Sequence, residues 1–112
     1  NILFAKMRTL MPHNWRNVLV IPTYNHSTER IAYLLRKILG SDYTWDILRI
    51  GESTDPANSK REAKALKNTT EINDQFQDGD HNAIYQGLLD THPAYGGTKW
   101  TMDELREEMK HE

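Results

Sequence analysis

Four consecutive apolar residues constrain the fold of this chain more than any other feature. Val18 to Ile21 form an uninterrupted apolar run, which stops at Pro22 and three polar residues. A run without apolar/polar alternation is typical of a parallel strand covered on both faces by helices. Pro22 has no backbone donor and favours extended geometry at Ile21, so we expect the strand, residues 17–22, to end there. Ligands of such sheets bind beyond the carboxyl ends of the strands.

The size and composition of the chain predict a single small α/β domain over residues 1–112. The absence of cysteine excludes disulfides, thiolate metal sites and cysteine nucleophiles. No apolar run is long enough to cross a membrane, and the first residues do not read as a signal peptide. We therefore expect a cytoplasmic protein with no membrane span.

The net charge of -2 conceals an asymmetry between the two halves of the chain. Residues 1–50 carry seven Lys/Arg and three Asp/Glu (+4), whereas residues 51–112 carry seven and thirteen (-6). The basic half could face an anion such as a nucleotide phosphate, or the charges could simply be solvated helix faces. So small a total charge argues against nucleic acid as a general partner.

The N-terminal half reads as helix, strand, helix, strand. An apolar helix over residues 2–11 is expected to be buried and to end before Pro12. After the first strand, a helix begins near Ser27, and Gly40 is placed to end it. Its apolar stripe has the spacing i, i+3, i+4, i+7 and consists of Ile31, Leu34, Leu35 and Ile38. Residues 46–50 form the second strand, in which Arg49 indicates an edge position or a partner for the guanidinium.

The remainder of the chain is predicted to be helical and acidic. Asp55 as N-cap and Pro56 at the first helical position begin a helix that runs to Lys67, with Ala63 and Leu66 as its buried residues. Residues 68–80 read as a polar loop, and residues 82–89 as a short helix. Thr101 to Glu104 form a capping box for a last helix, with a hydrophobic staple and an apolar stripe contributed by Trp100, Met102, Leu105 and Met109.

The predicted fold is therefore a short parallel sheet flanked by helices, a Rossmann-like or GT-A-like half over residues 1–67. Residues 68–112 add a polar loop and two short helices. Two parallel strands do not make a stable sheet by themselves. We expect a protein partner or further sequence to complete the sheet.

The two strand ends are expected to lie side by side, each followed by a helix N-terminus with free backbone donors. Such donors suit a phosphate, and the ring of Tyr24 could stack on a base. Glu52 and Asp55 could accept hydrogen bonds from a base or ribose, or hold a metal bound to phosphate. The alternative is that these polar residues only cap two helices. The candidate nucleotide-binding residues are Pro22, Thr23, Tyr24, Asn25, Glu52, Ser53 and Asp55.

These strand endings resemble the start of family 2 glycosyltransferases, which have a GT-A fold. The resemblance rests on Val-Leu-Val-Ile-Pro-Thr-Tyr-Asn at 18–25 and Asp-Ile-Leu-Arg-Ile-Gly-Glu-Ser-Thr-Asp at 46–55, with a weaker similarity at 78–88. It implies that Pro22, Tyr24 and Asn25 line a nucleotide pocket, that Glu52 and Asp55 contact uracil or ribose, and that Mn²⁺ or Mg²⁺ accompanies the nucleotide. The family's paired aspartates are replaced by Gly51-Glu52, and its Asp-x-Asp is absent. The resemblance therefore implies the donor-binding half only, and no catalytic residue is assigned.

Two other functions remain open. An apolar strand ending in Pro-Thr also suits a RecA or helicase-like fragment that contacts nucleic-acid backbone, although the chain has no phosphate-loop motif. A noncatalytic interaction module would use Tyr95, Trp100 and the methionine stripe as anchors. The histidines lack paired metal-ligand spacing, so we expect no protein-held metal. Only His81, between Asp78, Asp80 and the helix that follows, merits a test as a ligand cluster.

Overall fold

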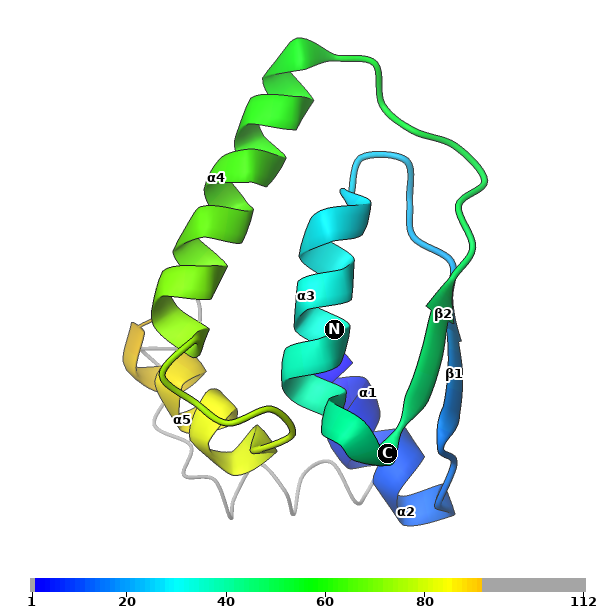
Figure 1. The fold of residues 1–112 in the computed structure, drawn as a ribbon, viewed down its shortest axis with the longest axis vertical. Coiled ribbons are helices and arrows are strands. Elements are labelled where there is room, and N and C mark those ends of the chain that lie inside the picture. The colour runs from blue at the N-terminus through cyan, green and yellow to red at the C-terminus, as the bar shows by residue number, and fades with distance from the viewer. Residues whose placement is uncertain (1, 92–112) are drawn as a thin grey trace.

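The computed structural model describes residues 2–91. Its elements, drawn in Figure 1, are α1 (Ile2–Ala5), a π-helical segment η1 (Lys6–Leu10), α2 (Met11–His13), β1 (Asn17–Val20), α3 (Thr28–Leu39), a 3₁₀ turn η2 (Gly40–Asp42), β2 (Thr44–Ile47), α4 (Pro56–Asn73) and α5 (His81–Thr91). The expected last helix, with its capping box, staple and apolar stripe, lies outside the described residues, as do Tyr95 and Trp100.

The sheet consists of two parallel strands, β1 and β2, in a register that pairs Asn17 with Thr44 and Val20 with Ile47. The prediction of a mixed α/β chain with a short parallel sheet flanked by helices is confirmed. The strands are shorter than expected: β1 ends at Val20 rather than at residue 22, and β2 spans 44–47 rather than 46–50. Pairing stops soon after the Leu48 N–H donates to the Val20 carbonyl at 2.9 Å.

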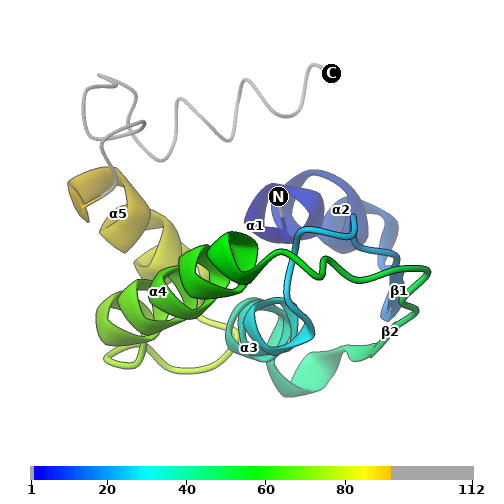
Figure 2. The same ribbon diagram turned by 90° about the horizontal axis from the view of Figure 1, so that it is seen from above.

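Helix α3 forms the centre of the molecule, between α4 on one side and the sheet on the other, with α1 across it (Figures 1 and 2). The Ser27 hydroxyl caps its N-terminus by accepting from Arg30 N–H at 3.3 Å, and Gly40 ends it with a φ of 70°. Both ends agree with the prediction. Leu35 and Leu39 on the sheet side are almost completely buried, whereas Ile38 packs with Leu3 towards α1 and α5.

One face of the sheet is uncovered in the described part of the chain. Val18 and Val20 pack against α3, but Leu19 is 59% exposed, and Ile21 and Leu48 also face outwards. Ile50, the next residue in this alternation, is 79% exposed. The expectation that both faces of the first strand are covered is therefore wrong for residues 2–91, because every described helix that packs on the sheet does so from its α3 side (Figure 2).

The N-terminal helix differs from the prediction in passing through Pro12. It continues to His13 and ends at Asn14, which adopts a left-handed conformation with a φ of 54°. In a regular α-helix the proline ring would clash with the carbonyl four residues earlier. Here the preceding turn, Lys6–Leu10, is π-helical. Because a π turn is wider than an α turn, it relieves this clash and the helix continues.

Helix α4 starts as predicted and extends further. Asp55 caps it by accepting from Ala57 N–H at 2.9 Å, and Pro56 is its first residue. The helix ends at Asn73 instead of Lys67, so residues 68–73 are not loop. This stretch contains no helix breaker, and Ile72 turns towards α3. Ala63 is exposed rather than buried, since the face that packs on α3 is centred on Glu62, Ala65, Thr69 and Ile72.

The loop between α4 and α5 docks against the C-terminal end of α3. The Gly79 N–H donates to the Lys37 carbonyl at 2.7 Å, and a Cβ on Gly40 would lie 2.9 Å from the Gly79 Cα. The buried ammonium of Lys6 donates to the carbonyls of Ile38 and Gly79 at 2.7 and 3.0 Å. Two glycines and one lysine therefore hold three segments together at this corner.

Candidate functional site

Two loops follow the parallel strands and lie against each other. Residues 21–27 connect β1 to α3, and residues 48–55 connect β2 to α4. The Ser53 N–H donates to the Tyr24 carbonyl at 2.9 Å, and the Asn58 side-chain amide donates to the Asn25 carbonyl at 3.1 Å. All seven candidate nucleotide-binding residues lie in this loop pair.

Arg49 links the two loops through its guanidinium. Its Nη1 donates to the His26 carbonyl at 2.6 Å and to the Thr28 hydroxyl at 3.3 Å, while its Nη2 donates to the Gly51 carbonyl at 3.1 Å. The side chain is only 16% exposed. Arg49 therefore follows β2 rather than interrupting it, and the guanidinium has the expected partner in the carbonyls at the strand ends.

The side chains of the candidate residues differ in how they are engaged. The Tyr24 side chain stands in solvent, at 67% exposure, and the Thr23 hydroxyl donates to the Asn25 side-chain oxygen at 2.7 Å. The Glu52 side chain is 76% exposed and lies 3.6 Å from the Arg49 Nε. The Ser53 hydroxyl accepts from the Asp55 N–H at 3.2 Å, and Asp55 caps α4.

The N-terminus of α3 holds a carboxylate from the protein itself. Glu62, a buried residue of α4, accepts the Ser27 N–H at 2.6 Å and forms an ion pair with Arg30 at 3.1 Å. A carboxylate is favoured there by the helix dipole and by the unpaired N–H groups. The expectation of free donors at both helix starts is therefore wrong at Ser27. Glu62 is not among the functional residues predicted from the sequence. The signal that could have identified it is its position on the same face of α4 as Ala65, Thr69 and Ile72.

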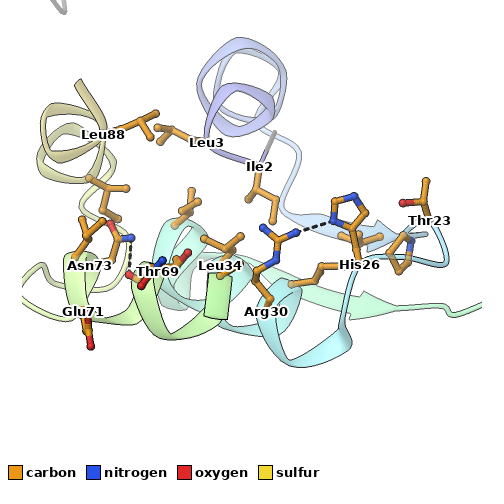
Figure 3. A pocket seen from close by; sticks show the side chains of 18 residues that line it. Ile2, Leu3, Thr23, His26, Arg30, Leu34, Thr69, Glu71, Asn73 and Leu88 are labelled. Atoms are coloured by element: carbon orange, nitrogen blue, oxygen red, sulfur yellow. Dashed lines mark hydrogen bonds between the residues drawn. The ribbon is translucent and has the colours of Figure 1, made fainter. Parts of the chain in front are cut away.

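A cavity of about 930 Å³ lies beside the strand-end loops, between α1, α3, α4 and α5 (Figure 3). Its floor and walls are mainly apolar, while its end near β1 carries Thr23, His26 and Arg30. The Arg30 Nη2 lies 2.8 Å from the His26 Nδ1. Pro22 and Thr23 are the two candidate nucleotide-binding residues that also line this cavity.

Tyr33 and Lys6 have shifted pKa values, and both lie away from the loop pair. Burial raises the pKa of Tyr33, whose hydroxyl donates to Asp74 at 2.6 Å and so adds to the shift. Burial lowers the pKa of Lys6, whose ammonium donates to the Ile38 carbonyl of α3 and to the Gly79 carbonyl of the α4–α5 loop.

Among residues 2–91, no group of three or more His, Cys, Asp or Glu side chains is arranged to hold a metal ion. Asp78, Asp80 and His81 therefore do not form such a group. Asp78 instead forms an ion pair with Lys37 at 2.9 Å, and Asp80 accepts from Ala83 N–H at 3.2 Å. No helix in the described range is long and apolar enough to span a membrane.

Comparisons with protein-family models, with curated proteins and with solved structures find no match to this chain.

Proposed function

We propose that the paired strand-end loops bind a nucleotide or nucleotide-sugar, as the donor-binding unit of a glycosyltransferase-like protein. The observation that carries the proposal is the tie between the two loops: Arg49 and the Ser53 N–H both bond to carbonyls of residues 24–26. This places seven polar or ring-bearing residues at the carboxyl ends of parallel strands, where ligands of such sheets bind. Catalysis would require further sequence or a partner.

Each side chain has a role that suits its exposure. The exposed Tyr24 ring offers a face for a nucleobase, as aromatic side chains do for unpaired bases. Glu52 and Asp55 offer carboxylate oxygens to ribose hydroxyls, or to Mn²⁺ or Mg²⁺ carried in with the phosphates. Pro22 and Asn25 would contribute to the same pocket from the loop that follows β1.

The phosphates would lie between the two loops, near Ser53 and Thr54, rather than at the start of α3. Glu62 already occupies the donors at the start of α3, and its negative charge would repel a phosphate there. Arg49 lies between the loops and pairs only loosely with Glu52, at 3.6 Å. The guanidinium already donates to oxygens of Tyr24, His26, Thr28 and Gly51, so a phosphate near Ser53 and Thr54 would gain its positive charge rather than a free donor.

Calorimetric titration of the full chain tests the proposal, with uridine diphosphate and Mn²⁺ against adenosine triphosphate and Mg²⁺. The informative variants are Glu52→Gln and Asp55→Asn, because asparagine is as good an N-cap as aspartate and α4 keeps its start. We expect saturable uridine diphosphate binding that weakens about tenfold in each variant, the effect of one lost charged hydrogen bond.

Glu71→Gln is the matched control, since Glu71 is an exposed glutamate of α4 distant from the loops. Equal binding by control and site variants would contradict the assignment of the site. Absence of binding to both nucleotides would contradict nucleotide binding as the function. Binding of single-stranded DNA instead would favour the helicase-like alternative.

The uncovered sheet face favours a second candidate function, a noncatalytic interaction module. Leu19, Ile21, Leu48 and Ile50 are large apolar residues that all face outwards from the strands and strand ends. Exposed large apolar residues on one face, here beside the polar Asn17, Thr44 and Asp46, are a feature of protein interaction sites. A protein partner covering this face would also supply the missing layer of the sheet.

A further inference from the structure

The cavity beside α3 is apolar along its floor and polar at one end. The floor is one face of α3, formed by Ile31, Leu34 and Ile38 at the spacing i, i+3, i+7, and it extends over about 10 Å. Ile2 lies across from this floor, and Leu88 lies at the end far from β1 (Figure 3). A volume of about 930 Å³ is large enough for a small molecule, and small-molecule sites are mostly apolar, with a few polar groups that orient the ligand.

The polar end of the cavity has two hydrogen-bond donors that the described chain does not use. The His26 ring and the Arg30 guanidinium lie side by side there, with the Arg30 Nη2 2.8 Å from the His26 Nδ1 (Figure 3). Because arginine only donates, the His26 Nδ1 is the acceptor and its Nε2 carries the hydrogen. Within residues 2–91, neither this Nε2–H nor the Arg30 Nη1 has a hydrogen-bond partner, since Glu62 bonds to the Arg30 Nε and Nη2.

The charges around His26 favour an anion at this end. Arg30 lines the cavity, is 23% exposed and pairs with Glu62. A second guanidinium, that of Arg49, lies outside the lining and donates to the His26 carbonyl at 2.6 Å. Its neighbour Glu52 is 76% exposed, so solvent screens that carboxylate. Two largely buried guanidinium groups therefore lie beside one buried carboxylate, and a ligand carboxylate would balance the remaining positive charge.

The other end of the cavity does not suit an anion. Glu71 is the only acidic residue among the described residues that line the cavity, and its side chain points away from the interior at the end far from His26 (Figure 3). On the same wall, the Asn73 side-chain amide donates to the Thr69 carbonyl of its own helix at 2.9 Å. An anionic head group is therefore favoured near His26, with an apolar tail along the floor.

We propose that this cavity binds a free fatty acid of medium chain length, with its carboxylate at Arg30 and His26 and its alkyl chain directed towards Leu88. A carboxylate accepts from both unused donors, and a linear chain matches a floor that follows one helix face. The proposal goes beyond nucleotide binding and does not depend on it, because Pro22 and Thr23 are the only candidate nucleotide-binding residues at the cavity.

Calorimetric titration of the full chain with dodecanoate, below its micelle-forming concentration, tests the proposal. We expect saturable binding at a single site. Decanoate, which is shorter by two methylene groups, should bind about tenfold more weakly because it buries less apolar surface. Dodecyltrimethylammonium has the same tail with a cationic head, and it should bind at least about tenfold more weakly than dodecanoate.

Variants of the floor and of the polar end locate the bound fatty acid. Leu34→Trp fills part of the cavity and should weaken dodecanoate binding at least about tenfold. Met11→Trp is the matched control, because it adds the same ring to an exposed apolar residue outside the cavity. His26→Phe keeps a ring and removes the Nε2–H donor, so binding should weaken about tenfold. Circular dichroism checks that each variant folds, and Ala65→Leu on the α4 wall replaces Leu34→Trp if the floor change unfolds the protein.

Absence of saturable dodecanoate binding would overturn the proposal. Equal affinity of the Leu34→Trp and Met11→Trp proteins would place the fatty acid outside the cavity. Equal affinity of the wild-type protein for dodecanoate and dodecyltrimethylammonium, or undiminished binding by His26→Phe, would contradict the carboxylate site at Arg30 and His26.

Discussion

At the scale of single residues, the fold depends on charged groups that lie inside it and bond to backbone atoms. Glu62 accepts a main-chain N–H at the start of α3, and Lys6 donates to the Ile38 carbonyl at its end as well as to the Gly79 carbonyl of the adjoining loop. Each places a charge of the sign that the helix dipole favours at that terminus. The central helix is therefore held at both ends by side chains from other helices.

Replacement of Glu62 by alanine is expected to destabilise the protein by about 1–3 kcal/mol, because it removes the acceptor of the Ser27 N–H and leaves Arg30 without its carboxylate. Urea unfolding followed by circular dichroism measures the change. Glu71→Ala, on the exposed side of the same helix, should lie within about 0.5 kcal/mol of wild type. A Glu62→Ala protein as stable as this control would show that the buried contact contributes nothing.

Tyr33 is expected to make stability fall at alkaline pH. Its pKa is raised in the folded state by burial, so folding keeps the hydroxyl protonated where the unfolded chain would ionise. The contribution is complete below pH 10, the ordinary tyrosine pKa, and is lost as the pH rises above it. Tyr33→Phe should flatten the decline in urea midpoint between about pH 9.5 and 11. Tyr24→Phe is the exposed control, and identical slopes for both variants would contradict this role.

At the scale of secondary-structure elements, the positions of the helix ends depend on both local sequence and tertiary contacts. The caps of α3 and α4, at Ser27 and Asp55, follow from residues within one turn of each helix start. The end of α3 depends in addition on a distant turn, since Gly40 and Gly79 touch through their backbones. Both glycines have positive φ, at 70° and 85°.

Gly40→Ala is expected to destabilise the protein by about 1–3 kcal/mol, because the new Cβ would meet the Gly79 Cα at 2.9 Å and the residue would keep a strained φ. Gly51→Ala provides the control. No atom lies within 4 Å of its added Cβ, so its effect should be within about 1 kcal/mol of zero. Thermal unfolding of the two variants measures the difference, and equal melting temperatures would exclude the close approach of the glycines.

At the scale of the whole molecule, α3 has a core cluster on each of two sides, and the sheet has one bare face in the described chain. One cluster joins α3 to the sheet, and the other joins it to α1 and α5. The outer face of the sheet has no such cover, and it presents Leu19, Ile21, Leu48 and Ile50 to solvent. A second copy of the chain could bind to this face, which is the most apolar exposed surface of the described strands.

Self-association through the outer sheet face is the expected consequence. The double variant Leu19→Thr/Ile50→Thr should weaken it at least about tenfold, as loss of two apolar side chains worth about 1.5 kcal/mol or more each predicts. Sedimentation velocity over a concentration series measures the change. Met11→Thr is the matched control, because Met11 is also exposed, at 42%, but lies off the sheet. A wild-type chain that remains monomeric throughout would contradict this prediction.

Much of the fold could be predicted from local signals. The Ser27 and Asp55 caps, the terminating Gly40 and the apolar run at 18–21 each act through bonds or steric limits within a few residues. Such signals are readable without tertiary structure. Two predicted helix ends were wrong. The N-terminal helix continues through Pro12 because the preceding turn is π-helical, and α4 continues through the polar residues 68–73.

The sequence alone determined the order of helices and strands, the parallel pairing implied by it, and the presence of polar residues at both strand ends. Only the tertiary structure decided which groups those residues meet. Arg49 bonds to a carbonyl 23 positions away, and Glu62 to an N–H 35 positions away. Contacts of that range depend on how the elements cross in space, which local bonding does not specify. Within residues 2–91 the same crossing leaves one face of the sheet open and brings the two strand-end loops into contact.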